Sequence, residues 1–227
     1  MASSNPSPAS PSLAEIPEAG AHDTVAALYR DLLATLGVDL VNLVYRHLAT
    51  VPDALAWAWA SLAPHFRSGA IDAQAQALRA QVRQAIAGWA PTFEAIGGGP
   101  ASAGALVLAR AYNLNNSRNL LALQHLLQAG TRAAGALPPG APGPDAAAQP
   151  SPTHALPPLP AWTDLRPADR ATVTRLNRLG ERAEPTIVAS LYRHLALWPE
   201  LLDAIEPALL RLDADGRMAS ALDHAVL

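Results

Sequence analysis

An internal repeat is the feature that most constrains the fold of this chain. The five residues from Tyr45 to Ala49 recur unchanged from Tyr192 to Ala196, at an offset of 147 positions. The same offset relates Pro52 to Pro199, Leu32 to Leu179, Val41 to Val188, Leu55 to Leu202 and Leu62 to Leu209. An identical run with an in-register proline and leucines indicates two copies of one structural unit.

The composition indicates that this unit is helical. Half of the residues are hydrophobic, whereas only 5% are aromatic, and alanine and leucine supply most of the apolar surface. Both residues favour helix, and the β-branched and aromatic residues that strands prefer are sparse. The sequence therefore predicts an all-α fold, a pseudo-dimer of two helical repeats.

Changes in composition divide the chain into four segments. Residues 1–22 begin with a Ser/Pro/Ala-rich stretch and are predicted to be a disordered tail. Residues 23–133 form the first helical repeat. Residues 134–160 contain nine prolines and are predicted to be a linker, because proline at that density prevents helix. Residues 161–227 form the second repeat.

Apolar periodicity and proline positions predict where the helices lie. In the first repeat the expected helices cover residues 24–36, 40–49, a shorter stretch around 55–62, 71–90 and 101–129. In the second repeat they cover residues 167–180, 185–197 and 199–212.

The second repeat is expected to be incomplete, since Leu227 corresponds to Ala80 and nothing matches residues 81–133. A truncated repeat leaves apolar helix faces uncovered. A homodimer, repacking of the ends of the two copies, and a truncated gene product remain as alternatives.

Charge and residue usage exclude several classes of function. The formal net charge is −3, all 16 basic residues are arginines and no basic cluster occurs, which argues against nucleic acid and against a polybasic membrane anchor. The chain has no cysteine, so thiol chemistry is excluded. No secretory signal and no apolar run of about 18 residues is present, and we expect a cytoplasmic protein without membrane partners.

Motifs for cofactors and metals are missing from the sequence. The seven histidines show no metal-ligand spacing, and no dinucleotide-binding, phosphate-loop or nucleophile-elbow motif occurs. We therefore expect neither a metal nor a cofactor.

An asparagine-rich patch, Asn113 to Asn116, interrupts the longest apolar helix. Asparagine forms helix poorly and is costly when it is buried without partners. The patch indicates either a solvent-facing kink or a functional site. Of its residues, Asn116 is the strongest candidate for a functional role.

The order of these features resembles the DehI-type D,L-2-haloacid dehalogenases. The resemblance runs from about Thr24 onward and rests mainly on three stretches: Leu48 to Pro52, Asn113 to Asn116 followed by Leu120-Leu121, and Ser190 leading into Trp198-Pro199. It implies an all-helical pseudo-dimer with the active site between its repeats. It also implies a hydrolase that cleaves the carbon–halogen bond of a short 2-halocarboxylate by direct attack of water, without metal or covalent intermediate.

The resemblance assigns roles to individual residues. Asn116 matches the asparagine that holds the attacking water, and Ala189 and Ser190 match the residues before the catalytic aspartate. The aspartate itself falls on Leu191, which cannot accept a proton. Leu40 and Leu43 match positions that shape the apolar pocket.

Loss of the aspartate leaves three functional alternatives. His194 lies three residues after Leu191 on the same helix, so a neutral imidazole there is a candidate replacement for the base. Without a base, the chain is expected to be a non-catalytic protein that binds a small carboxylate, or a helical interaction module. The two Tyr-Arg-His-Leu-Ala runs are interpreted mainly as packing residues of the repeat.

Overall fold

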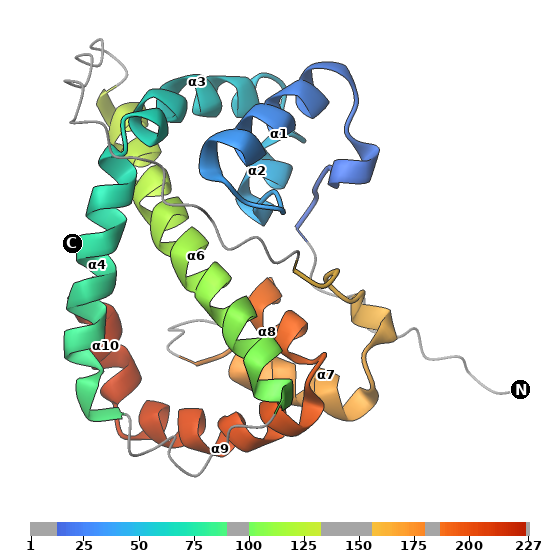
Figure 1. Ribbon diagram of the computed structural model, residues 1–227, viewed down its shortest axis with the longest axis vertical. Helices are drawn as coiled ribbons and strands as arrows, with labels where there is room; N and C mark the ends of the chain where they lie inside the picture. The colour runs from blue at the N-terminus through green and yellow to red at the C-terminus, as the bar shows by residue number, and fades with distance from the viewer. Residues whose placement is uncertain (1–12, 90–99, 133–155, 180–186, 226–227) are drawn as a thin grey trace, which may run out of the picture. The chain divides into compact units, whose positions relative to one another are not determined.

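The computed structural model describes residues 13–89, 100–132, 156–179 and 187–225. Within these ranges the backbone forms helices and no strand, which confirms the predicted all-α class (Figure 1). The chain separates into two compact units. The N-terminal unit comprises residues 14–88, 106–157 and 224–227, and the C-terminal unit comprises residues 1–13, 89–105 and 158–223.

The N-terminal unit is built on four helices that precede α6. They are α1 (Asp23–Leu36), α2 (Leu43–Leu48), α3 (Ala54–Arg67) and α4 (Ala70–Ala85), and α6 (Pro100–Arg132) follows a short 3-10 turn, η2 (Ala87–Trp89). The predicted helix over 71–90 is therefore shorter and ends in this turn. The apolar faces of α1 and α3 pack together around Tyr29, Leu32, Trp59 and Leu62, which are at most 3% exposed.

The turn after α1 begins the wall of the cavity described below. Gly37 adopts the left-handed conformation with φ 61°, and the N–H of Val38 donates to the carbonyl of Leu33 at 3.2 Å. This is the bonding of a helix end closed by glycine, and a side chain at Gly37 would strain it. The chain then runs extended until Asn42 caps α2, accepting from the N–H of Val44 at 3.1 Å.

Part of the segment predicted to be a disordered tail is ordered in the structure, whereas residues 1–12 of that segment lie outside the described residues. Residues 14–22 are anchored to the N-terminal unit and include a 3-10 turn, η1 (Glu18–Gly20). The N–H of Ile16 donates to the carbonyl of Arg46 at 3.0 Å, and its carbonyl accepts from the Tyr29 hydroxyl at 2.9 Å. The Glu18 carboxylate accepts from the N–H of the buried Val41 at 2.8 Å. These tertiary contacts order a segment whose own composition does not favour helix.

The described residues of the C-terminal unit form a 3-10 turn and four helices besides the start of α6. These are η3 (Trp162–Asp164), α7 (Pro167–Leu176), α8 (Ser190–Leu195), α9 (Pro199–Ala214) and α10 (Arg217–Ala225). The core includes Val173, Leu176, Leu202 and Leu212, each at most 1% exposed. At Gly104, in the first turns of α6, a Cβ would lie only 2.9 Å from Cζ2 of Trp198, so the close packing there requires glycine.

Helix boundaries recur at the offset of the sequence repeat. Residues 43–48 form α2 and residues 190–195 form α8, so both ends of this helix repeat at 147 positions. The end of α3 and the start of α4 recur at the end of α9 and the start of α10. Helix α10 was not anticipated from the sequence. The predicted linker lies outside the described residues from 134 to 155, and the pseudo-dimer arrangement stays a prediction.

Candidate functional site

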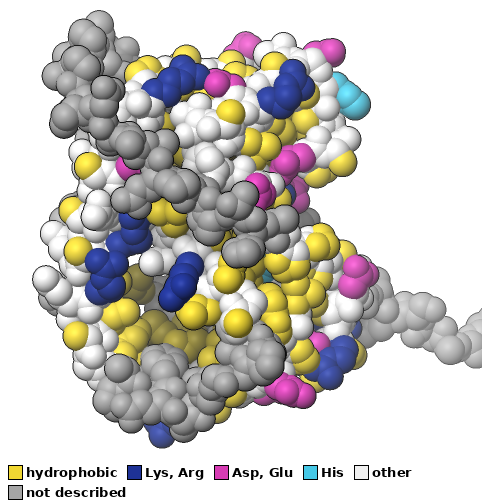
Figure 2. Space-filling model, viewed as in Figure 1, with side chains coloured by type: hydrophobic (Ala, Val, Ile, Leu, Met, Phe, Trp, Pro, Cys, Tyr) yellow, Lys and Arg dark blue, Asp and Glu magenta, His cyan; other side chains and the backbone are white. Residues whose placement is uncertain are grey.

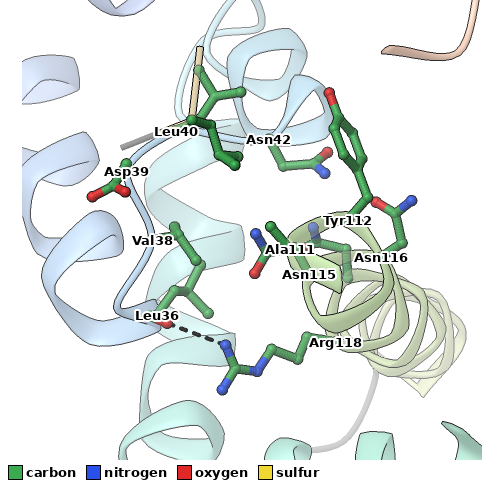
Figure 3. A pocket seen from close by; sticks show the side chains of 12 residues that line it. Leu36, Val38, Asp39, Leu40, Asn42, Ala111, Tyr112, Asn115, Asn116 and Arg118 are labelled. Atoms are coloured by element: carbon green, nitrogen blue, oxygen red, sulfur yellow. Dashed lines mark hydrogen bonds between the residues drawn. The ribbon is translucent and has the colours of Figure 1, made fainter. Parts of the chain in front are cut away.

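A cavity in the N-terminal unit is the candidate functional site. It lies between α6 and the segment that connects α1 to α2, and its volume is about 50 Å³ (Figure 3). One wall comes from Leu36, Val38, Asp39, Leu40 and Asn42, the other from Ala111, Tyr112, Asn115, Asn116, Arg118 and Asn119, and Leu156 adds to the lining. An apolar cavity of about 150 Å³ holds benzene, so this space fits a molecule of only a few heavy atoms or several waters.

The polar wall of the cavity follows from helical spacing. Tyr112, Asn115, Asn116 and Asn119 stand at positions i, i+3, i+4 and i+7 of α6, which places them along one face of the helix. In Figure 3 the amide of Asn115 projects toward the Val38–Leu40 wall. Asparagines at these positions weaken the helix, so a role for their side chains is the simplest reason for their presence.

The opposite wall is mainly apolar. Leu36, Val38 and Leu40 present aliphatic side chains to the cavity, and the amide of Asn42 points toward Tyr112 and Asn116 (Figure 3). Asp39 is the acidic residue among the described lining residues, but its carboxylate points away from Asn115 in the same view. The cavity therefore combines an aliphatic side with a side of amides.

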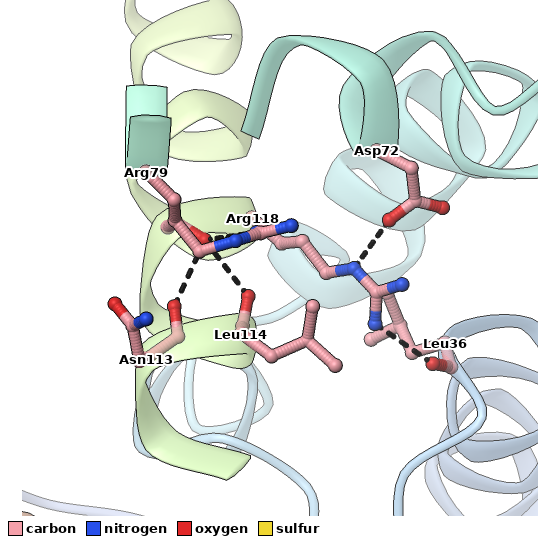
Figure 4. A network of polar contacts seen from close by, with 7 residues as sticks. Leu36, Asp72, Arg79, Asn113, Leu114 and Arg118 are labelled. Atoms are coloured by element: carbon pink, nitrogen blue, oxygen red, sulfur yellow. Dashed lines mark hydrogen bonds and ion pairs between the residues drawn. The ribbon is translucent and has the colours of Figure 1, made fainter. Parts of the chain in front are cut away.

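Arg118 joins the cavity to the rest of the unit. Its Nε donates to Oδ1 of Asp72 on α4, and its Nη1 donates to the carbonyl of Leu36 at 3.2 Å (Figures 3 and 4). The Arg118 side chain is 10% exposed, whereas that of Asp72 is 39% exposed. A buried guanidinium held at two atoms fixes the start of the Leu36–Asn42 wall relative to α6.

A second arginine lies beside this pair. Arg79 Nη1 donates to the Ser117 hydroxyl at 2.7 Å, and that hydroxyl lies 2.9 Å from the carbonyl of Asn113 and 3.0 Å from that of Leu114 (Figure 4). Burial and, next, the positive charge of Arg118 lower the pKa of Arg79. Burial is the main cause of this lowered pKa; the positive charges of Arg118 and Arg83, which outnumber the negative charge of Asp72, add an excess of positive charge behind the cavity.

The charge excess extends along both helices. Of the described side chains on α4 and α6, the charged ones are Arg79, Arg83, Arg110, Arg118 and Asp72. These five side chains sum to a charge of +3 in a chain whose net charge is −3. Of them Arg118 lines the cavity, to which Asp39 adds a carboxylate. A net positive charge on these helices favours an anionic ligand.

Asn119 has unsatisfied hydrogen-bonding capacity. Its side chain is 7% exposed, and Oδ1 has no hydrogen-bond partner among the residues that the structure describes. A buried acceptor without a partner costs about 1–3 kcal/mol. Because Asn119 also lines the cavity, a ligand or water in that space is the natural source of the missing hydrogen bond.

The residues predicted from the sequence fall in both units. Leu40 and Asn116 line the cavity, whereas Leu43 begins α2 and is not among the described lining residues. Ala189, Ser190, Leu191 and His194 belong to the C-terminal unit, where Ala189 precedes α8 and its N–H donates to Asn177 at 2.7 Å. His194 is fully buried in that unit. The structure brings Leu40 and Asn116 together.

Several lining residues were not predicted. Asn42, Asn115, Asn119 and Arg118 contribute the polar groups of the cavity besides Asn116 and Tyr112. The sequence contains a signal for the lining residues on α6, because the polar run that begins at Asn113 continues to Asn119 and its asparagines recur at helical spacing. The contribution of Asn42 required the tertiary structure.

Comparison of the chain with protein-family models, curated proteins and solved structures finds no match. Among the described residues, no three histidine or acidic side chains are grouped as metal ligands would be. In the same part of the chain, no helix has the length and apolar character that crossing a bilayer requires.

Proposed function

We propose that the protein binds a short carboxylate, such as a 2-halocarboxylate, in the cavity between α6 and the Leu36–Asn42 wall. The observation that carries this proposal is the row of amides on the cavity wall, Asn115, Asn116 and Asn119, in which the buried Oδ1 of Asn119 has no partner among the described residues. Oδ1 accepts hydrogen bonds, and an ionised carboxylate also only accepts, so the partner of Oδ1 in this proposal is a water that enters with the acid. That water donates one hydrogen to Oδ1 and the other to the carboxylate.

Size and charge narrow the class of ligand. The volume of about 50 Å³ accommodates a few heavy atoms, as in a two- or three-carbon acid. The net positive charge of the described side chains on α4 and α6, of which Arg118 lines the cavity, favours a negatively charged ligand. The amides of Asn115 and Asn116 offer donors for a carboxylate, and Val38 and Leu40 offer an apolar surface for a 2-substituent such as a halogen.

Hydrolysis of the carbon–halogen bond is the second candidate, and it is favoured by the position of Asn116 in the cavity wall. In the reaction that the dehalogenase resemblance implies, water attacks C2, halide leaves and a base takes the proton of the water. Leu191 cannot act as that base, His194 is fully buried in the C-terminal unit, and the Asp39 carboxylate points away from Asn115. General base assistance contributes about 10² to 10⁴ in rate, so we rank binding above hydrolysis.

Calorimetric titration of the full chain with 2-chloropropionate, propionate and neutral propionamide tests the binding proposal. We expect both carboxylates to bind more tightly than propionamide. Asn119→Ala is expected to weaken binding, whereas Asn113→Ala is the matched control, because Asn113 lies on the same helix but does not line the cavity. Equal binding of the amide and the acids, or none of either, contradicts the proposal.

Halide release from D- and L-2-chloropropionate between pH 6 and 10 separates the two candidates. Binding without halide release supports a non-catalytic carboxylate-binding protein. Release that is lost in Asn116→Ala and retained in Asn113→Ala would instead establish the hydrolase.

A further inference from the structure

The exposed face of α6 carries a regular row of apolar and asparagine side chains. Four leucines are unusually accessible for helix residues: Leu106 is 50% exposed, Leu120 49%, Leu123 37% and Leu127 71%. Asn113 and Asn116 are also exposed and lie in the interval between Leu106 and Leu120. The face is therefore apolar at both ends and amide-bearing in the middle.

The spacing of these residues follows a heptad. Positions 106, 113, 120 and 127 recur every seven residues, and positions 109, 116 and 123 each lie three residues after one of them. Seven-residue spacing with a three-residue offset is the a/d pattern by which two helices pack along their length. We call Leu106, Ala109, Asn113, Asn116, Leu120, Leu123 and Leu127 the α6 seam.

The core of the N-terminal unit does not use the α6 seam. The core-facing side of α6 is formed by other residues, among them Leu108, Ala122, Leu126 and Ala129, each at most 8% exposed. The helix thus has two apolar faces, of which only one is covered by the residues that the structure describes. On the molecular face drawn in Figure 2, hydrophobic side chains form contiguous areas between scattered charges.

We propose that the α6 seam packs against the α6 seam of a second copy of the chain, with the two helices antiparallel. Alignment about the midpoint between Leu114 and Asn115 places Asn113 opposite Asn116 of the second copy. It also places Leu106 opposite Leu123 and Ala109 opposite Leu120. In this alignment the amide side chains of Asn113 and Asn116 face each other, leucine faces leucine, and the small Ala109 faces the larger Leu120.

Chemistry favours a second copy over other occupants, and the exposed area limits the strength of the association. No charged residue occupies the α6 seam, so a partner needs no opposite charge. The two asparagines need polar partners at matched positions, which a bilayer does not provide and self-pairing does. The exposed leucine surface is on the order of a few hundred Å² per copy, enough to mark an interaction site but less than the ~800 Å² of a standard interface. A weak, concentration-dependent dimer is therefore expected.

Pairing of the two helices can be tested with single cysteines, because the native chain contains none. The variants are Leu106→Cys and Leu123→Cys, oxidised separately and as an equimolar mixture. The two positions are about 25 Å apart along one helix at 1.5 Å per residue, whereas a disulfide requires Cα atoms within about 7 Å. We expect covalent dimers in the mixture and little in either variant alone. Self-crosslinking of each variant, or no crosslinking in the mixture, overturns the antiparallel dimer.

Sedimentation equilibrium measures the association without crosslinks. The average mass of the wild type is expected to rise with concentration, and Leu120→Glu is expected to remain monomeric because it places a charge in the α6 seam. Leu197→Glu is the matched control, since Leu197 is 41% exposed and lies in the C-terminal unit outside the seam. Circular dichroism verifies that each variant is folded. A wild type that is monomeric throughout, or a Leu120→Glu variant that still dimerises, refutes the proposal.

Discussion

Replacement of Asn119 by leucine is expected to stabilise the free protein while abolishing ligand binding. In the wild type, Oδ1 of Asn119 is buried without a described partner, which costs about 1–3 kcal/mol. Leucine removes that cost and has a higher helix propensity by about 0.5 kcal/mol. The larger side chain can extend into the adjacent cavity of about 50 Å³, which limits the overpacking that a filled core would impose. The net expectation is a gain of about 1 kcal/mol.

Thermal unfolding followed by circular dichroism measures this change. For a domain of this size, 1 kcal/mol corresponds to a rise of about 2–4 °C in Tm. Asn113→Ala serves as a control for helix propensity, because Asn113 is exposed on the same helix and does not line the cavity. The gain in Asn119→Leu should exceed the gain in this control.

The same experiment with ligand separates a functional asparagine from a structural one. At a ligand concentration of 100 times Kd, the wild type gains about 2.7 kcal/mol, whereas Asn119→Leu should gain nothing. Destabilisation of the free Asn119→Leu protein by more than about 1 kcal/mol would refute the reasoning, because it would show that the amide is satisfied within the fold.

Three further substitutions test the framework around the cavity. Arg118→Met should lower the free energy of unfolding in urea by about 2 kcal/mol, since it removes bonds to Asp72 and Leu36 while Asp72 remains partly hydrated. Gly37→Ala should cost about 1–2 kcal/mol in the same assay, because alanine is strained at φ 61°. The hydrogen bond from Arg166 holds the pKa of Asp169 below its usual value of about 3.9, so its stabilisation is complete above that value and is lost as pH falls through the lower folded pKa. Asp169→Asn should therefore flatten the stability curve measured by urea unfolding in the acid range below about pH 4, and an unchanged acid slope would contradict this assignment.

The sequence by itself determined the helical class and the placement of most helices. Alanine and leucine at helical spacing, with prolines and Gly37 between the periodic runs, specify local structure through short-range geometry. The 147-residue offset was likewise readable in advance, and the bounds of α2 and α8 follow it. The polar run on α6 also marked one wall of the candidate site.

Only the tertiary structure decided which residues meet. Asn42 and Leu40 are about 70 positions away from Asn115 in the chain, and their approach depends on the Gly37 turn and on Arg118 holding the Leu36 carbonyl. The anchoring of residues 14–22 likewise depends on Arg46, Tyr29 and Val41, which accept or donate bonds that no local pattern reveals. Local periodicity sets which face of a helix is apolar or polar, whereas packing between distant segments determines whether that face meets the core, a ligand or another chain.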